Sequence, residues 1–253
     1  EKQFGDILTD LDKLYGPNTT VEIDGILCET DDRGEIFKID GEVVQDSDYE
    51  CNGTQYLSDE NGNILAWKGK PSYNPENERD SGAQINAGGM DRLKDDDGSH
   101  AVARIMNGSP GSENLIPMRA TLNRGDWKQG ENTIVDALQN GKKVEDSGIV
   151  FRESDNTRPT KVVREFTHGN IREMLVVDNV KGSHELLHDL KESVGHEDYK
   201  SIVNEIKRKE SGGSTISVTS VSKRYDLEGN LECVQVGIRD ETAGTKNYKE
   251  FKP

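Results

Sequence analysis

The sequence predicts an α+β protein with a mixed or antiparallel sheet, and three observations lead to this prediction. Short strand-like segments pair through glycine-containing turns in the first third of the chain. A long helical segment in the middle has strand-like segments on either side, and the last part has two helical segments followed by two strands. We therefore expect an acidic N-terminal hairpin extension of the core's sheet over residues 1–78, a core over 79–180 and a small C-terminal α+β module of unknown role over 181–253.

Two similar segments, Asp24–Lys38 and Asn52–Ala66, lie 28 residues apart in the N-terminal third. Each contains a strand, an acidic turn with glycine and a second strand, which predicts a β-hairpin. The acidic turns suit ordinary turn chemistry better than a calcium loop, because they lack its bidentate glutamate. Ahead of them, residues 5–15 have apolar residues at helical spacing and stop before Gly16-Pro17, so a short helix is expected.

The middle of the chain begins with residues 71–99, which are rich in Gly, Asn and Asp and predict a long surface loop. Beyond it we expect strands at Ala101–Met106, Asn114–Pro117, Gly148–Arg152 and Thr160–Val177, with a helix from about Arg124 to Asn140 that Gly141 closes. Near the C-terminus we expect helices over residues 184–193 and 197–210 and strands over 214–224 and 230–239.

Charge is distributed unevenly along the 253 residues, whose net charge is −16. Residues 1–78 contain 19 acidic and 6 basic residues, whereas residues 79–145 contain 10 and 9. A basic phosphate-binding surface over the whole molecule is therefore excluded, but the balanced middle with its arginines leaves room for a local one. The acidic third is solvated surface, or else a face that binds a basic partner or keeps nucleic acid away.

Composition also limits the class of protein. No run of about 18 apolar residues is present, so no membrane-spanning helix is expected. The N-terminus lacks the apolar core of a signal peptide and does not start with Met, so we expect a processed chain or the tail of a longer one. Cys28, Cys51 and Cys233 show no metal-binding spacing and allow at most one disulfide.

The stretch from Asp91 to Glu131 carries the polar residues that suggest chemistry. It contains Asp95-Asp96-Asp97-Gly98-Ser99-His100, Asn114-Leu115-Ile116-Pro117, Leu122-Asn123-Arg124-Gly125-Asp126-Trp127 and then Glu131. Taken alone, a histidine beside a strand is usually a packed or surface residue, and an asparagine before a helix is usually an N-cap. The joint spacing favours a catalytic site, because Asn123 follows Asn114 by nine residues and Glu131 follows Asn123 by eight.

This run resembles the DNA/RNA non-specific endonuclease family, whose fold is the ββα-metal (His-Me) finger. The family pattern has an Asp-x-Gly-His strand start, an Asn-Leu-x-Pro strand, an asparagine at a helix start and a glutamate eight residues later. Upstream, Arg79, Gln84 and residues 88–93 are similar to the lead-in of secreted bacterial toxin members, including type VII secretion nuclease toxins. The resemblance covers roughly residues 20–178 and is most specific over 79–145.

The resemblance implies roles that fit the chemistry of phosphodiester hydrolysis, which needs a base for water and cations for the charge gained at phosphorus. His100, expected just before a strand, is implied to be the general base, since a free imidazole has a pKa of about 6.5. Asn123, at the expected helix start, is implied to bind Mg²⁺ or Mn²⁺. Glu131, roughly 12 Å further along the helix axis, is implied to orient the water shell of the ion.

Three supporting residues and two departures complete the resemblance. Asn114 is implied to support the site, and Arg79 to clamp the substrate phosphate. Gly98 stands where some members have arginine, so a phosphate contact is lost unless Arg92 or Arg79 supplies it. Ser99 stands where the family has a tightly fitted glycine, so a slightly altered or slower site is expected.

We therefore expect a metal-dependent endonuclease that cuts DNA, with RNA as an alternative substrate, through phosphate contacts that carry little sequence specificity. The resemblance implies products with 5′-phosphates. It also implies the toxin domain of a secreted antibacterial effector, with an immunity protein as partner and no membrane partner.

Two other functions stay open. His184-Glu185-Leu186-Leu187-His188 matches the HExxH pattern of zinc metallopeptidases, in which both histidines lie on one helix face. His196 could serve as a third ligand, but its offset from His184 does not fit the longer pattern of that class. The leucines also give this helix an ordinary amphipathic stripe. The second alternative, a binding module that kept the nuclease fold without activity, is supported by Ser99 alone.

Overall fold

The computed structural model describes residues 15–78, 80–153, 156–179 and 183–252. The helix expected over residues 5–15 lies almost wholly outside the described residues, as does Arg79. Every strand pair in the described part is antiparallel, so the α+β class with a largely antiparallel sheet is confirmed. No helix in this part of the chain is long and apolar enough to cross a membrane.

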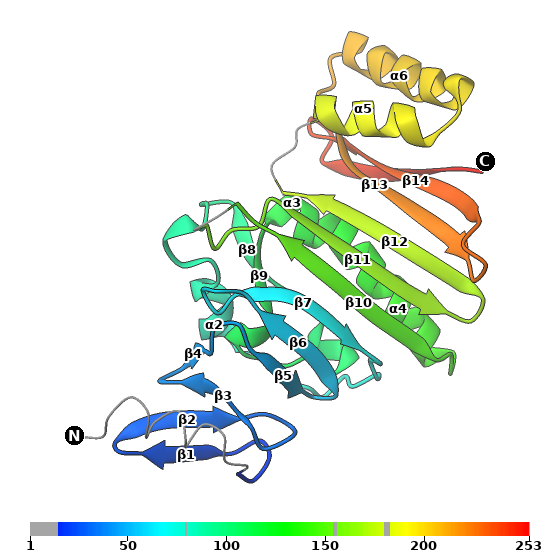
Figure 1. The fold of residues 1–253 in the computed structure, drawn as a ribbon. Coiled ribbons are helices and arrows are strands. Elements are labelled where there is room, and N and C mark those ends of the chain that lie inside the picture. The colour runs from blue at the N-terminus through cyan, green and yellow to red at the C-terminus, as the bar shows by residue number, and fades with distance from the viewer. Residues whose placement is uncertain (1–14, 79, 154–155, 180–182, 253) are drawn as a thin grey trace.

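The described strands form three sheets (Figure 1). The first follows the order β1 (Thr20–Ile23), β2 (Ile26–Thr30), β3 (Ile36–Ile39) and β4 (Glu42–Val43). The second has nine strands in the order β15 (Thr245–Phe251), β14 (Leu231–Asp240), β13 (Ile216–Asp226), β12 (Ile171–Asp178), β11 (Lys161–His168), β10 (Val144–Phe151), β7 (Ile64–Gly69), β6 (Thr54–Ser58) and β5 (Asp48–Cys51). The third pairs β8 (Asp96–His100) with β9 (Leu115–Arg119).

The helices accompany these sheets. They are α2 (Ser81–Asn86), α3 (Ala120–Leu122), α4 (Lys128–Gln139), α5 (Ser183–Ser193) and α6 (His196–Ser211), with short 3-10 turns η1 (Gly89–Asp91), η2 (Arg104–Met106) and η3 (Ser112–Asn114). A π-helical segment, η4 (Asn123–Trp127), joins α3 to α4 into one helical stretch over residues 120–139. In Figure 1 this stretch lies behind β10–β12, while α5 and α6 lie at the top.

The expected N-terminal hairpins are β2–β3 and β6–β7, and aspartate side chains close their acidic turns. The carboxylate of Asp31 accepts hydrogen bonds from the backbone N–H groups of Arg33 and Glu35 at 2.9 and 3.0 Å. Asp59 holds the backbone of its own turn in the same way, at 2.9 Å. These are Asx turns, so ordinary turn chemistry explains the acidic residues there.

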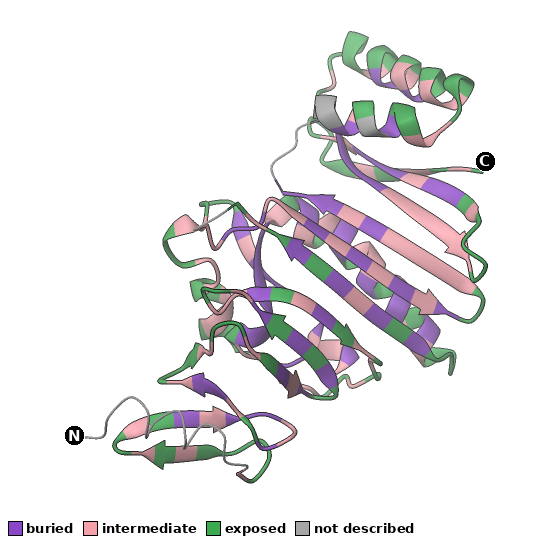
Figure 2. Cartoon of the chain, in the orientation of Figure 1, coloured by how far each residue is buried: buried purple, intermediate pink, exposed green. Residues whose placement is uncertain are grey.

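The main hydrophobic core joins the helical stretch to the nine-stranded sheet. Trp127 and Ile134 of this stretch are fully buried in one cluster with Trp67 and Phe166 of the sheet. Strands β10 and β11 alternate buried residues with more exposed ones along their length, as Figure 2 shows. This alternation is typical of an antiparallel sheet that is covered on one face.

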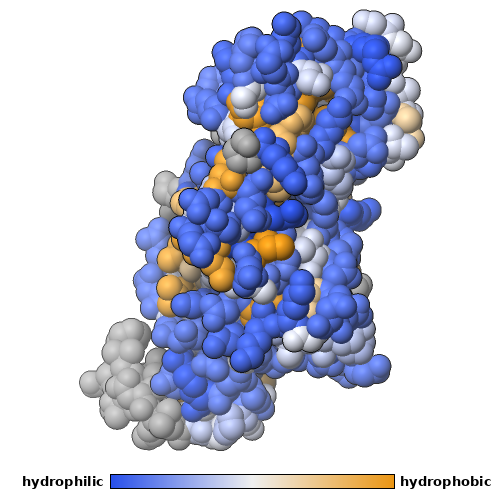
Figure 3. Space-filling view, turned by 90° about the vertical axis from the view of Figure 1, so that its right-hand side faces the viewer, coloured by the Kyte–Doolittle hydropathy of each residue, from blue (hydrophilic) through white to orange (hydrophobic). Residues whose placement is uncertain are grey.

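Strands β13–β15 continue this sheet beyond β12, because residues 171–176 of β12 pair with residues 221–226 of β13. Helices α5 and α6 pack on β13 and form a second hydrophobic cluster that includes Leu190, Ile202 and Val236. The face in Figure 3 is mostly hydrophilic, with apolar patches at mid-height and near these upper helices. The C-terminal segment therefore shares the nine-stranded sheet with the core but has its own hydrophobic cluster. The sequence pattern did not predict β15, which is largely polar.

The prediction of a strand at Ala101–Met106 is wrong, because the strand β8 ends at His100, just before this segment. The loop expected over residues 71–99 contains α2 and leads into β8, so His100 ends a strand instead of preceding one. The backbone N–H of Ala101 donates to the carbonyl of Asn114, and that of Val102 to its Oδ1, both at 2.9 Å. The apolar pattern there reflects the burial of an irregular segment.

Two further boundaries differ from expectation. The helix begins at Ala120 and not near Arg124, so Asn123 lies inside the helical stretch. The strand expected over residues 160–177 is the hairpin of β11 and β12, which turns at Gly169 with a φ of 61°. The three cysteines are buried and free.

Candidate active site

A pocket lies where the end of β8 meets the helical stretch, and three of the expected site residues meet in it. His100 comes from β8, Asn123 from η4 and Glu131 from α4. The full lining is Gln84, Gly98, Ser99, His100, Ala103, Arg104, Ile105, Asn123, Arg124, Lys128 and Glu131. Strand, strand and helix follow one another along the chain around this pocket.

His100 is held in place by its backbone. It pairs with Leu115 of β9, and its carbonyl oxygen accepts a hydrogen bond from Nε1 of Trp127 at 3.0 Å. The residue is only 8% exposed. Because Trp127 belongs to the helical stretch, this bond fixes the strand of His100 against the helix that carries Asn123.

Asn123 is hydrogen-bonded to the same strand through Asp97, a residue for which the sequence predicted no role. Its Nδ2 donates to Oδ2 of Asp97 at 2.9 Å, and Arg124 donates to both oxygens of Asp97 at 2.8 Å. Burial alone would raise the pKa of Asp97, but the hydrogen bonds from Arg124 and Asn123 lower it below its ordinary value. Asp97 is therefore ionised at neutral pH beside the amide of Asn123.

Glu131 brings a carboxylate into the pocket. It is 7% exposed, and Nζ of Lys128 donates to its Oε2 at 3.0 Å. Burial raises the pKa of Glu131, while the nearby cations Lys128 and Arg164 oppose this rise. Arg164 is itself fully buried in an ion pair with Asp146, with both bonds at 2.8 Å. A hydrated cation in the pocket would favour the ionised form of Glu131 further.

Asn114 does not line the pocket but holds the segment that follows His100. It is fully buried, and its Nδ2 donates to the carbonyls of Val102 and Ser109 at 2.8 and 2.7 Å. Its Oδ1 accepts from the backbone N–H of Val102. Asn114 thus positions the loop at the pocket wall.

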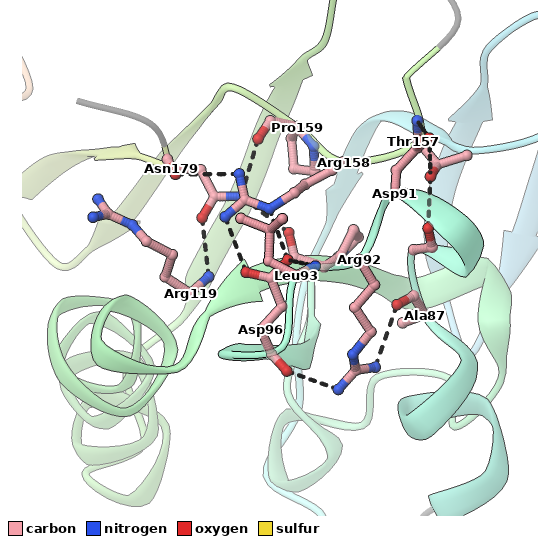
Figure 4. A network of polar contacts seen from close by, with 12 residues as sticks. Ala87, Asp91, Arg92, Leu93, Asp96, Arg119, Thr157, Arg158, Pro159 and Asn179 are labelled. Carbon is pink, nitrogen blue, oxygen red and sulfur yellow. Dashed lines mark hydrogen bonds and ion pairs between the residues drawn. The ribbon is translucent and has the colours of Figure 1, made fainter.

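The guanidinium of Arg92 is engaged by backbone carbonyls and lies outside the pocket lining. It donates to the carbonyls of Gln84 and Ile85 of α2 at 2.6 and 2.7 Å. Figure 4 shows its further bonds to the carbonyls of Ala87 and Asp96, at 3.3 and 2.8 Å. Arg92 therefore joins α2 to β8, and Arg79, the other expected phosphate contact, lies outside the described residues.

Asp96 anchors β8 to the rest of the core. Its carboxylate forms a buried bidentate pair with Arg158 at 2.7 and 2.9 Å and accepts from the backbone N–H of Leu93 (Figure 4). Arg158 also donates to the carbonyl of Asn179, which follows β12. Two consecutive aspartates therefore have different roles. Asp96 fixes the strand to the core, and Asp97 accepts a hydrogen bond from Asn123.

The two departures at positions 98 and 99 have different structural settings. A Cβ at Gly98 would lie 2.8 Å from the Cα of Gln84, so the packing of α2 against β8 leaves no space for a side chain. Ser99 is 1% exposed, and its Oγ has no hydrogen-bond partner among the described residues. The structure therefore explains the absence of arginine at position 98 and places an unpartnered hydroxyl at the pocket wall.

Asn123 and Glu131 in the pocket, with Asp97 hydrogen-bonded to Asn123, fit a hydrated hard cation. Mg²⁺ keeps several waters and binds few protein oxygens, and an amide oxygen beside an ionised carboxylate suits it. Asn123 and Glu131 line the pocket and could hold it, while the ionised Asp97 adds negative charge through its hydrogen bond to Asn123. No cluster of three or more His, Cys, Asp or Glu side chains suited to a metal is found in the described part of the chain.

The HExxH motif lies on α5, far along the chain from the pocket. Leu186 and Leu190 belong to the C-terminal hydrophobic cluster, and His188 is exposed. The side chains of His184 and Glu185 lie outside the described residues. Its leucines therefore have the structural role that an amphipathic stripe predicts.

Comparisons with known proteins match a part of the chain that contains the pocket residues. Residues 45–169 match the DNA/RNA non-specific endonuclease family. The type VII secretion system protein EssD of Staphylococcus aureus strain USA300 is 38% identical over 109 residues, covering 40% of this chain and 18% of that protein. EssD from strains NCTC 8325 / PS 47 and Newman gives the same figures. The match thus spans less than a fifth of the length of these relatives.

Proposed function

We propose, because residues 45–169 match the DNA/RNA non-specific endonuclease family, that the protein is a metal-dependent endonuclease. It would hydrolyse phosphodiester bonds of DNA, with RNA as an alternative substrate. One observation carries the proposal: His100, Asn123 and Glu131 line a single pocket although they come from three elements. The order of strand, strand and helix around this pocket supports a ββα-metal finger.

In this proposal His100 accepts a proton from the attacking water. A neutral imidazole near pH 7 suits this role, and the end of β8 holds the residue at the pocket wall. Arg104, Arg124 and Lys128 line the same pocket and attract phosphate oxygens by charge. Such contacts do not distinguish bases, which supports cleavage with little sequence specificity.

In this proposal Asn123 would hold Mg²⁺ or Mn²⁺ and Glu131 would orient its water shell. The ionised Asp97, which is hydrogen-bonded to Asn123, would add negative charge. When bound, the ion stabilises the negative charge that develops on the departing oxygen. Lys128 fixes the carboxylate of Glu131 from one side, so that its other oxygen remains for water.

The direct test is the nicking of supercoiled plasmid by the purified chain. We expect cleavage with Mg²⁺ or Mn²⁺, loss of cleavage with a chelator, and recovery when the metal is restored. The His100→Ala variant, with an unchanged circular dichroism spectrum, controls for a contaminating nuclease. Equal nicking by this variant would reject the assignment. A folded wild type that binds plasmid without cutting it would instead show an inactive binding module.

The similarity to a type VII secretion system protein extends the proposal to the role of the chain in the cell. We propose that it is a secreted antibacterial toxin domain that an immunity protein neutralises in the producing cell. Expression of the wild type in a susceptible bacterium should stop growth and fragment the chromosome, and His100→Ala should do neither. Growth arrest without DNA or RNA loss would contradict this role.

A further inference from the structure

We propose that the C-terminal strands position the metal-binding helix, with Lys246 of β15 and Ser220 of β13 holding Asp126 and thereby setting the place of Asn123. This inference rests on the proposed nuclease function. It gives residues 183–253, which lie beyond the matched family region, a role in the site.

The contact itself is a buried ion pair between distant parts of the chain. Asp126 is 2% exposed, and Nζ of Lys246 donates to its Oδ2 at 2.6 Å. The hydroxyl of Ser220 donates to the other oxygen, Oδ1. The side chain of Lys246 is 15% exposed. Removing one partner of such a pair leaves an uncompensated buried charge, so the pair resists separation.

Glycines on both sides make room for this ion pair. A Cβ at Gly125 would collide with Nζ of Lys246, and a Cβ at Gly237 of β14 would lie 2.6 Å from Oδ1 of Asp126. The helix and the strand therefore both lack a side chain where the ion pair forms. Next to it, Nε2 of Gln129 donates to Oε1 of Gln235 at 3.1 Å, which adds a second contact between the same two parts.

The place of Asp126 in the helix links this contact to the pocket. Asp126 lies three residues after Asn123 in the same π-helical segment, Asn123–Trp127. π-Helical turns are uncommon and occur often at functional sites, where tertiary contacts maintain them. Here Trp127 and Asn123 hold the segment to β8, whereas Asp126 holds it to β13 and β15. The segment that presents Asn123 is thus fixed from two directions.

The test compares two lysines of β15. Lys246→Met removes the contact with Asp126, whereas Lys249→Met removes an ion pair with Glu205 of α6 and leaves the helical stretch untouched. We expect hydrogen exchange at the amides of residues 123–127 of the metal-free protein to rise at least about tenfold in Lys246→Met alone. Binding of Mn²⁺, measured by electron paramagnetic resonance without substrate, should weaken about tenfold in the same variant, as loss of an outer-shell contact does.

The outcomes separate this inference from the proposed function. If Lys246→Met and Lys249→Met match in both measurements, the positioning role is rejected while the nuclease assignment stands. If the wild type neither binds Mn²⁺ nor nicks plasmid, the proposed function fails, and this inference fails with it. Should Lys246→Met not fold, Ser220→Ala removes the milder half of the contact. Its Mn²⁺ affinity should fall about two- to threefold, and an unchanged affinity would overturn the inference.

Discussion

The N-terminal four-stranded sheet and the C-terminal strands both flank the core that bears the pocket, but they join it in different ways. Among the described strands, β1–β4 pair with none of the nine-stranded sheet, and the buried ion pair of Lys38 with Glu113 at 2.6 Å links them to the core. The C-terminal strands extend the ladder of β12 and reach Asp126 beside Asn123. We therefore expect the first attachment to affect stability alone and the second to affect the proposed site as well.

The largest expected effect is the loss of plasmid cleavage in a His100 variant. His100→Ala should reduce plasmid cleavage by about 10³-fold, because a positioned base contributes on the order of 10²–10⁴-fold. Its thermal unfolding should match the wild type within a few degrees, since the contacts that fix the strand come from the backbone of His100. Cleavage above one tenth of the wild-type rate would contradict the role of this imidazole.

The N-terminal attachment is tested by Lys38→Met. The side chains of Lys38 and Glu113 are 9% and 4% exposed, so loss of the lysine should cost about 3 kcal/mol of the free energy of unfolding. Urea denaturation measures this loss, and the double variant with Glu113→Gln should recover part of it. The Mg²⁺ concentration for half-maximal cleavage should not change. A shift in this Mg²⁺ concentration would show that the N-terminal sheet also affects the proposed site.

Glu131→Ala tests the helix that the C-terminal strands hold. We expect cleavage to fall about tenfold or more at low Mg²⁺ and to recover largely at saturating Mg²⁺, because in the proposed function Glu131 would act through the waters of the ion. A Mg²⁺ titration of initial rates measures this. An unchanged midpoint of the Mg²⁺ titration would reject the proposed role of Glu131 in metal binding.

The smallest expected effect concerns pH. Burial raises the pKa of Glu131 and Lys128 opposes the rise, so the carboxylate gains its proton as the pH falls through this raised pKa. Cleavage at low Mg²⁺ should therefore decline on the acid side, and Lys128→Met should move the decline to higher pH. Asn132→Met, at an exposed position of the same helix, provides the control. A shift to lower pH in Lys128→Met would contradict the coupling.

The sequence predicts the features that depend on local pattern. The hairpins at β2–β3 and β6–β7 follow from alternation and Asx turns, and the shared pocket of His100, Asn123 and Glu131 agrees with their spacing on a strand and a helix. Asn114 has a supporting contact, as its resemblance implies, but to the loop and not to the pocket.

The features that the sequence does not predict depend on contacts between distant residues. The segment at Ala101–Ala103 is apolar because it is buried, and only the bond to Asn114 reveals that it is not a strand. Asp97 is one of three consecutive aspartates, and only the structure shows which of them faces Asn123. The contact of Asp126 with Lys246 spans 120 residues, and no periodic pattern indicates it.

The fit of Gly98 against Gln84 has a consequence for how substrate is held. A short helix and a cationic side chain cannot both occupy that wall of the pocket, because the backbone of α2 already fills the space. In the proposed function, charge for phosphates comes instead from Arg124 and Lys128 of the helical stretch, which also line the pocket. Grafting an arginine at position 98 would therefore displace α2 before it could strengthen binding, so tighter variants are better sought on the helical side.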